Sequence, residues 1–342
     1  MSVFICVYLW LPLLCLAQRR VIIDTDPGVD DAFALLFALR SPELKVEAIT
    51  VVAGNVPAEV GLPNALRMRE IAGRPEVPVA LGAKAPLLRK LVTAYYAHGE
   101  NGLGGIPFPE PKTKPVSDFG PDLIRRIVRQ YPKEVSIIPI GPLTNVALAL
   151  QADPELAGLI KEIVLMGGSI SGGNTTPSAE FNIYVDPEAS RIVFQSGVPI
   201  TMVGLDVTRK CFVTEEHAKA LEASKTPWGQ AAARLARNGL DRARARGGRG
   251  PVMHDGLAVV SFLDRSVLKT QDFYVDIETS GELTAGETVA YRNAPIRRSP
   301  PTMAEPAGWF VLSDTFKPNT HVGIDVDVEK FFKIFIGRLA SP

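Results

Sequence analysis

The chain has 342 residues, of which 46% are hydrophobic, and its 37 Lys and Arg residues balance 37 Asp and Glu residues. This length and composition are sufficient for a full hydrophobic core, in one large α/β domain or in two domains. The formal net charge of +0 offers no electrostatic basis for binding nucleic acid.

The first 17 residues differ in composition from the rest of the chain. Residues 3–17 are almost wholly apolar and end in small residues, which predicts a secretory signal peptide at residues 1–17, although no Lys or Arg precedes the apolar run. The run is short for a membrane span, and no later segment reads as transmembrane, so no stable membrane anchor is expected. Residues 18–342 are expected to form one domain.

The next feature is an acidic segment between a predicted strand and a predicted helix. Residues 24–31 (D-T-D-P-G-V-D-D) hold four carboxylates, follow an apolar strand at 21–23 and lead into a helix over about 30–39. In an open α/β sheet, ligands bind where such strands end. So many negative charges repel one another unless a cation binds there, and oxygen ligands favour a hard ion, Ca²⁺ or Mg²⁺.

A simpler explanation covers only part of this segment. Asp30 could merely stabilise the positive end of the helix that begins there. That role does not account for Asp24 and Asp26, which come before the Pro-Gly turn. The segment therefore predicts a metal site.

Strand-like and helix-like segments alternate along the following 170 residues. After residues 21–23, strands are predicted at 46–52, 78–81, 135–139, 162–166 and 199–203, and helices at 59–72, 118–130, 143–150 and 186–196. This alternation predicts an α/β fold with a doubly wound, mostly parallel sheet. Beyond about residue 214 the pattern mixes helix with a hairpin near 272–292, which we interpret as a C-terminal elaboration of the same domain.

Polar groups follow several of the predicted strands. The strands end in Ala53-Gly54-Asn55, in Gly141-Pro142-Leu143-Thr144-Asn145 and in Met166-Gly167-Gly168. Each of these three segments alone could be an ordinary turn, because Gly and Asn favour turns. Because the ends of parallel strands share one edge, their repetition beside the acids predicts a common pocket, where Gly lets the backbone approach a ligand.

Two later segments add polar side chains. Residues 172–182 (G-G-N-T-T-P-S-A-E-F-N) present amides and a carboxylate, which suit a ligand with many hydroxyl groups. His254 and Asp255 open a further apolar helix, where Asp255 could be no more than a helix cap. Residues 242–249 (R-A-R-A-R-G-G-R) are basic, but a short Gly-containing segment is interpreted as a solvated loop.

Taken together, these motifs resemble the inosine–uridine nucleoside hydrolase family. The resemblance covers essentially everything after about residue 20 and keeps the order and spacing of the family's segments. Its segments are residues 24–31, 53–55, 98–99, 141–145, 166–168, 179–182 and 254–255. The family's most specific signature is the acidic segment 24–31.

The resemblance implies the family's fold, its Ca²⁺ ion and its N-glycosidic bond hydrolysis, which yields free base and ribose. It implies metal ligation by the Asp26, Asp31 and Asp255 carboxylates and the Ile140 carbonyl. It implies substrate binding by Asp30, Asn55, His98, Asn174, Glu180 and Asn182. The substrate would be a ribonucleoside, and the protein a homodimer or homotetramer.

The implied chemistry suits these residue types. Breaking an N-glycosidic bond builds positive charge on the sugar, as in glycoside hydrolysis, and surrounding carboxylates stabilise that charge. The metal would acidify a water molecule that attacks the sugar, and Asp26 would take its proton. His254 would protonate the departing base, since its unperturbed pKa suits that role.

The chain departs from the family's pattern in one region. Family members often place aromatic residues over the base, yet none occurs here between Trp228 and His254. The sequence therefore leaves the base preference open. It also leaves two other classes of protein to be distinguished. These are a non-catalytic Ca²⁺-dependent nucleoside or sugar binder on the same fold, and a haloacid-dehalogenase-like phosphatase, which would not explain residues 180–182 or 254–255.

The cellular location is an expectation that rests on residues 1–17. Cleavage would remove Cys6 and Cys15 and leave Cys211 alone, so no intrachain disulfide would support export. A glycan on the sequon at Asn174 would block the predicted pocket, a conflict that bacterial export avoids. An exported, periplasmic or extracellular enzyme is expected. The alternative is a cytoplasmic enzyme with a misassigned start codon.

Overall fold

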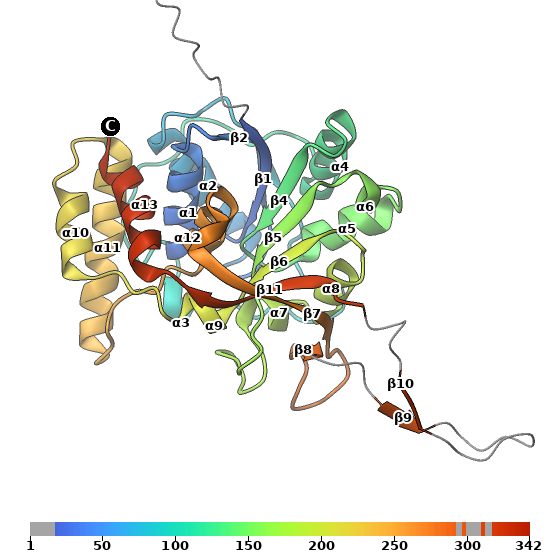
Figure 1. Cartoon of the computed structure of the whole chain (residues 1–342). Helices are drawn as coiled ribbons and strands as arrows, with labels where there is room; N and C mark the ends of the chain where they lie inside the picture. The colour runs from blue at the N-terminus through green and yellow to red at the C-terminus, as the bar shows by residue number, and fades with distance from the viewer. Residues whose placement is uncertain (1–17, 292–295, 299–308, 312–316) are drawn as a thin grey trace, which may run out of the picture.

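The computed structural model describes residues 18–291, 296–298, 309–311 and 317–342. The predicted signal peptide at residues 1–17 lies outside the described residues. Within them, nine strands form one sheet in the order β3-β2-β1-β4-β5-β6-β11-β7-β8 (Figure 1). The strands are β1 Arg19–Thr25, β2 Leu44–Val51, β3 Val79–Leu81, β4 Val135–Pro139, β5 Glu162–Met166, β6 Ile200–Val203, β7 Leu268–Ile277, β8 Thr288–Tyr291 and β11 Thr320–Val326.

The sheet is buried on both faces by helices (Figure 1). On one face pack α1 (Val29–Leu39), α2 (Ala58–Ile71), α10 (Glu215–Glu222), α11 (Pro227–Ala245), α12 (His254–Leu263) and α13 (Val328–Ala340). On the other pack α4 (Gly120–Gln130), α5 (Thr144–Ala152), α6 (Leu156–Leu159) and α8 (Pro187–Phe194). The prediction of a doubly wound α/β fold is confirmed.

Strand β1 shows why a continuous apolar run is needed at the centre of this sheet. Val21 and Ile23 pack into the hydrophobic cluster on one face, and Ile22 packs into the cluster on the other. All three side chains are fully buried. A strand covered by helices on both faces cannot alternate apolar with polar residues, as a half-exposed strand does.

The C-terminal elaboration contains the predicted hairpin and three strands that the sequence pattern missed, β9 (Ile296–Arg298), β10 (Trp309–Val311) and β11. β7 and β8 pair antiparallel, which confirms the hairpin near residues 272–292. β11 comes from near the end of the chain and inserts between β6 and β7, parallel to the first and antiparallel to the second. The short strands β9 and β10 pair with each other.

The order of the strands reverses between β1 and β4, because the chain runs from β1 outward to β3 before it returns to β4. In doubly wound sheets, ligands bind at this switch point, beyond the carboxyl ends of the strands. Short helices lie at this edge: α3 (Tyr95–His98), α7 (Phe181–Val185) and α9 (Leu205–Thr208). None of the helices in the described part of the chain is both long and apolar enough to cross a membrane.

Candidate active site

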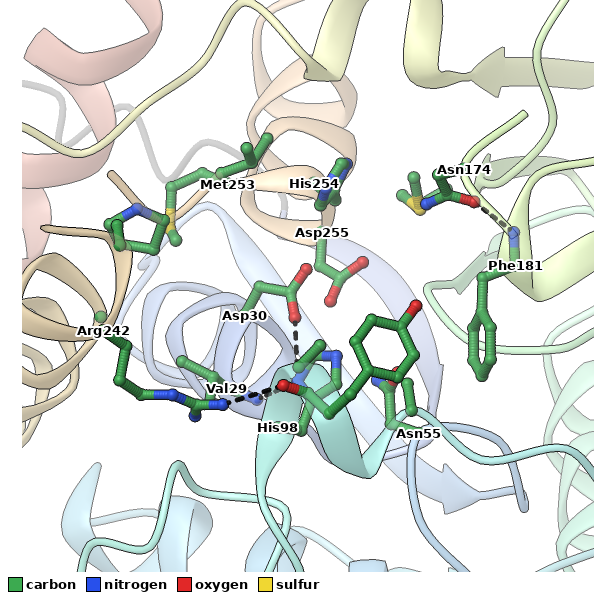
Figure 2. Close-up of a pocket in the computed structure, with 18 of the residues that line it drawn as sticks. Val29, Asp30, Asn55, His98, Asn174, Phe181, Arg242, Met253, His254 and Asp255 are labelled. Carbon is green, nitrogen blue, oxygen red and sulfur yellow. Dashed lines mark hydrogen bonds and ion pairs between the residues drawn. The ribbon is translucent and has the colours of Figure 1, made fainter. Parts of the chain in front are cut away.

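A cavity of about 390 Å³ opens at the carboxyl edge of the sheet (Figure 2). It draws on the first turns of α1 and α12, on α3, on the ends of β4 and β5, on α11, and on the loop that leads into α7. Nine of the eleven residues assigned to the site from the sequence line it: Asp30, Asn55, His98, Ile140, Asn174, Glu180, Asn182, His254 and Asp255. The other two, Asp26 and Asp31, are fully buried.

Three carboxylates converge on one side of this cavity. Oxygen atoms of Asp30, Asp31 and Asp255 all lie within 4.8 Å of one another. Burial, followed by the charge of Asp31, raises the pKa of Asp30 to about 7. Burial and then the charges of Asp30 and Asp31 raise the pKa of Asp255 well above its ordinary value. Such a group of buried acids needs either protons or a cation, because isolated buried charges are costly.

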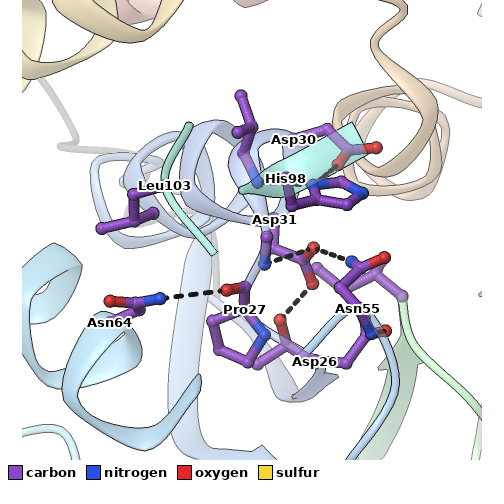
Figure 3. Close-up of polar contacts among 12 residues, drawn as sticks. Asp26, Pro27, Asp30, Asp31, Asn55, Asn64, His98 and Leu103 are labelled. Carbon is purple, nitrogen blue, oxygen red and sulfur yellow. Dashed lines mark hydrogen bonds and ion pairs between the residues drawn. The ribbon is translucent and has the colours of Figure 1, made fainter. Parts of the chain in front are cut away.

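Asp31 is the most firmly anchored member of this group (Figure 3). Its Oδ1 accepts a hydrogen bond from Thr25 Oγ1 at 2.5 Å, and its Oδ2 accepts from Gly28 N at 2.9 Å and from Asn55 Nδ2 at 3.0 Å. The amide nitrogen of Asn55, assigned to substrate binding from the sequence, therefore also positions a carboxylate. Three donors around one carboxylate fix the direction in which its remaining lone pairs point.

Asp26 has an oxygen atom with no protein partner. Its Oδ2 accepts from Asn55 N at 2.7 Å, whereas its Oδ1 is buried and has no hydrogen-bond donor among the described residues. Burial, then the neighbouring Asp31 charge, raises its pKa well above the ordinary value. A buried oxygen without a donor is rare in folded proteins and is explained when an ion or water binds it.

Two glycines let the backbone approach Asp26. A Cβ atom on Gly54 would lie 2.1 Å from Asp26 Oδ2, and one on Gly141 would lie 2.6 Å from Asp26 Oδ1. Close approach to this carboxylate is thus one reason for Gly at these two strand ends, and close approach to a ligand stays a prediction. Asp24 accepts two side-chain hydrogen bonds at Oδ1, from Thr50 Oγ1 at 2.5 Å and Asn145 Nδ2 at 2.7 Å, but its Oδ2, like Asp26 Oδ1, has no partner among the described residues.

The donor set fits a hard divalent cation. Oxygen atoms of Asp30, Asp31 and Asp255 form the cluster, whereas Asp26, a ligand expected from the sequence, does not belong to it. The Ile140 carbonyl lies at the cavity wall, where it accepts from Asn182 Nδ2 at 3.3 Å. No His or Cys belongs to the cluster found among the described residues, and all-oxygen sites suit Ca²⁺ or Mg²⁺. The unpartnered Asp26 Oδ1 and the raised carboxylate pKa values are what an ion at this position would relieve.

Polar side chains line another side of the cavity. Glu180 caps α7: its Oε2 accepts from Gly168 N at 3.0 Å and from Ile183 N at 3.1 Å. The Asn174 side chain accepts from Phe181 N at 2.9 Å. Together with Asn182, these residues place amide and carboxylate groups where a sugar could meet them, since such groups both donate to and accept from hydroxyls.

Two histidines lie in the cavity with depressed pKa values. His98 Nδ1 accepts from Val29 N at 3.0 Å, and burial, then the charges of His254 and Arg242, lowers its pKa to about 3. His254 Nδ1 lies 2.8 Å from Thr208 Oγ1, and burial lowers its pKa to about 4. Both imidazoles are therefore neutral at pH 7. The unperturbed pKa expected for His254 from the sequence is wrong, so this residue could protonate a departing base only through a neutral ring N–H. The sequence anticipated both histidines but not Thr208, since no local pattern links α9 to α12.

The basic segment 242–249 is not simply a solvated loop. Residues 242–245 are the last turn of α11, and both Arg242 and Arg246 line the cavity. Their guanidinium groups donate to the same acceptor, the Tyr96 carbonyl, at 3.2 Å and 3.0 Å. The interpretation from sequence failed because it weighed glycine content and charge without knowing that α11 packs beside α3.

The fold and this cavity place a cluster of buried carboxylates beside amide and carboxylate side chains at the switch point of an α/β sheet. Comparison with known proteins gives the family. The chain matches the family model of the inosine-uridine preferring nucleoside hydrolases over residues 21–333. It therefore belongs to that family and is a ribonucleoside hydrolase, which confirms the fold, family and reaction expected from the sequence.

Several curated relatives are similar over nearly their whole length. The pyrimidine-specific ribonucleoside hydrolase RihA of Salmonella gallinarum is 41% identical over 321 residues, which cover 93% of this chain and 97% of that protein. The protein of the same name from Photobacterium profundum is 41% identical over 330 residues, covering 95% and 99%.

Solved structures share the fold at lower identity. A plant nucleoside hydrolase, the PpNRh1 enzyme, superposes with a TM-score of 0.85 at 32% identity, covering 95% of this chain and 100% of the other. A purine-preferring ribonucleoside hydrolase from Gardnerella vaginalis gives 0.84 at 32%, covering 94% and 98%. Relatives named for opposite base preferences thus share one fold.

Proposed function

We propose that this chain is a calcium-dependent ribonucleoside hydrolase that prefers pyrimidine nucleosides and splits uridine and cytidine into free base and ribose. The observation that carries the proposal is the convergence of Asp30, Asp31 and Asp255, from the first turns of two helices far apart in the sequence, beside a wall of sugar-binding groups. The pyrimidine preference is supported by the 41% identity to the RihA proteins.

The proposed cation ligands are the carboxylates of Asp26, Asp31 and Asp255 and the carbonyl of Ile140. A bound Ca²⁺ would neutralise these acids, hold ribose hydroxyls and lower the pKa of a water molecule. Asp30 lies close enough to Asp31 and Asp255 to contact the ribose from the edge of the same site. The oxygen-only donor set supports Ca²⁺ over a softer ion.

The chain's own groups then supply the proton transfers. Asp26 Oδ1 has no protein donor, so it is free to accept a proton from the attacking water. Glu180 and Asn182 fix the ribose and, with the carboxylates, stabilise the positive charge that develops on it. His254 is held by Thr208 through Nδ1 and can present its other ring nitrogen to the departing base.

A panel of nucleosides tests this function. The purified protein, loaded with Ca²⁺, should release ribose from uridine and cytidine with higher kcat/KM than from inosine, adenosine or guanosine. Calcium-dependent binding of uridine without ribose release would instead identify a binder on the same fold. Phosphate release from a phosphoester, without ribose release from any nucleoside, would identify the phosphatase alternative.

We also propose a location and an assembly. The apolar start of the chain supports export, with cleavage after Ala17, and the place of Asn174 beside the cavity supports a route without N-glycosylation. A mature N-terminus at Gln18 in mass spectrometry is expected, and a retained Met1 would refute export. Family membership supports a homodimer or homotetramer, which sedimentation of the purified protein tests directly.

A further inference from the structure

The cavity has two chemically different ends (Figure 2). One end holds Asn174 and Phe181. The other holds Arg242, whose guanidinium lies near Val29 and His98 and donates to the Tyr96 carbonyl at 3.2 Å. The buried carboxylates lie between the two ends, beside His254. A nucleoside whose ribose reaches the carboxylates and the Asn174 end must therefore direct its base toward the arginine end.

The arginines at that end lack acidic partners. Two other arginines of α11 are neutralised: Arg237 and Arg244 pair with Glu215 at 2.6 Å and 2.7 Å. By contrast, no Asp or Glu oxygen of the described residues lies within 4.0 Å of a guanidinium nitrogen of Arg242 or Arg246. Each of these two groups donates to a single backbone carbonyl, so most of its five donors remain available.

The geometry gives this end of the cavity a donor-rich, positively charged character. Arg242 is half-buried and Arg246 is exposed at the mouth, and the two are one helical turn apart. No aromatic residue occurs between Trp228 and His254, so the part of α11 that follows Trp228 presents no ring to the cavity, although Tyr96 of α3 lines the same end. What this part of α11 offers instead is guanidinium hydrogen bonds, which are directional and always charged.

We propose that Arg242 and Arg246 recognise the base and select uracil over cytosine, an inference that rests on the proposed function. Uracil presents two carbonyl acceptors, O2 and O4, to these donors. Cytosine keeps O2 but replaces O4 with an amino group, which is itself a donor and meets the guanidinium groups unfavourably. By the same reasoning, purines that carry a carbonyl group should bind at this end better than purines that carry an amino group.

The same contacts assist the bond-breaking step. Water oxygen bonds to ribose C1′ as the bond from C1′ to base N1 breaks, and the electron pair of that bond stays on the base. The negative charge spreads from N1 to O2 and O4, where guanidinium donors stabilise it until His254 gives a proton to the base, while Asp26 holds the proton that the attacking water releases. Interactions that strengthen as charge develops raise kcat as well as affinity.

The test compares three substitutions in one helical segment. Arg242→Gln and Arg246→Gln remove a charge from the cavity, and Arg244→Gln removes a charge that faces Glu215 outside it. We expect the ratio of kcat/KM for uridine to that for cytidine to fall about tenfold in Arg242→Gln, the size expected for one lost hydrogen bond to a charged group. Arg246→Gln should show a smaller fall, and Arg244→Gln none.

Further measurements separate this inference from its alternatives. Arg242→Lys keeps the charge and should restore part of the ratio. Uridine 5′-monophosphate serves as a competitor: if the arginines bind a phosphate, Arg242→Gln will weaken that competition and leave the uridine-to-cytidine ratio unchanged, which overturns the proposal. Equal losses on uridine and cytidine would overturn it as well.

The proposed pyrimidine preference can be wrong while the inference about Arg242 and Arg246 is right, and the two failures can be told apart. If the wild-type protein releases no ribose from uridine or cytidine, the pyrimidine preference is wrong, and calorimetry with free uracil and free cytosine then decides the inference by itself. Tighter binding of uracil than cytosine, lost in Arg242→Gln and kept in Arg244→Gln, supports it. Equal binding of the two bases, or equal binding by wild type and Arg242→Gln, refutes it.

Discussion

The carboxylate cluster and the arginine end of the same cavity are built in opposite ways. The cluster is buried, its members come from the first turns of α1 and α12, and Asp31 alone accepts three hydrogen bonds. The arginine end comes from the last turn of α11 and from α3, and its guanidinium groups reach solvent with one protein acceptor between them.

This difference separates the two tasks of the enzyme. Cleavage of the glycosidic bond needs groups held in fixed positions in a water-poor environment, which the sheet edge provides. Choice of base needs only a few side chains, and these can differ between relatives without disturbing the sheet. The shared fold of relatives named for pyrimidine and for purine substrates agrees with that division.

The largest effect is expected from removing Asp31. Asp31→Ala should abolish metal binding and lower kcat on uridine by at least ~10³-fold, since loss of an ionic ligand from a cation site disables the chemistry it supports. The fold should survive, because one less buried charge offsets the lost hydrogen bonds. Ribose release, elemental analysis and circular dichroism check these outcomes.

Asp122→Ala is the matched control for Asp31→Ala, since Asp122 also sits in the first turn of a helix, α4, but is exposed and pairs with Arg125. It should leave activity and metal content unchanged. Normal metal content in Asp31→Ala would contradict its assignment as a ligand.

A smaller loss, which depends on the leaving group, is expected at His254. His254→Ala should slow uridine hydrolysis by ~10²–10⁴-fold, the usual value of general acid catalysis. It should spare p-nitrophenyl riboside, whose leaving group needs little protonation. His321→Ala, an exposed histidine paired with Asp272, is the control. Equal losses on both substrates would mean that His254 positions the substrate and does not protonate it.

A still smaller effect is expected from crowding the cluster without removing a ligand. A Cβ on residue 141 would lie 2.6 Å from Asp26 Oδ1 and 3.0 Å from Asp26 N, so the Gly141→Ala variant must displace Asp26. Misplacement of a reacting group by about 1 Å costs up to ~10²-fold in rate. Gly158→Ala, in a helix with open space around it, should change nothing. Full activity in Gly141→Ala would show that the position of Asp26 is unimportant.

The smallest effect concerns stability, and its sign follows from the raised pKa values. Burial raises the pKa of Asp24 and of Asp30 to about 7, above their values in the unfolded chain. Groups of this kind stabilise the fold while protonated and lose that contribution as pH rises through the folded-state pKa. Metal-free protein should therefore have a lower Tm at pH 9 than at pH 7.

Added Ca²⁺ should counteract the fall in Tm that metal-free protein shows at high pH. Protons compete with a cation for the same carboxylates, so added Ca²⁺ should raise the Tm more at pH 9 than at pH 7. Scanning calorimetry of chelated and reloaded protein measures both shifts. A calcium effect that is larger at pH 7, or absent at both, would speak against a cation among these carboxylates.

The two regions also differ in how far the sequence predicts them. Most of the carboxylate cluster can be predicted from the sequence because residues 24–31 join a buried strand to a helix in one continuous segment. The end of a parallel strand is a known position for ligands. His98 and the loop at 174–182 could be assigned to the site because their motifs occur in the same order as in the family that the sequence resembles. The arginine end depends on α11 lying beside α3, and the insertion of β11 depends on pairing across more than 100 residues. Local patterns carry no information about such contacts.

Chelation tests whether one cation site performs the chemistry while a separate end of the cavity chooses the base. The rate of ribose release from uridine and from cytidine is measured on the protein as purified, after exhaustive chelation, and after Ca²⁺ is added back. We expect both rates to collapse together and to recover together, with their ratio unchanged. Normal hydrolysis of either nucleoside by protein that elemental analysis shows to be metal-free would contradict it.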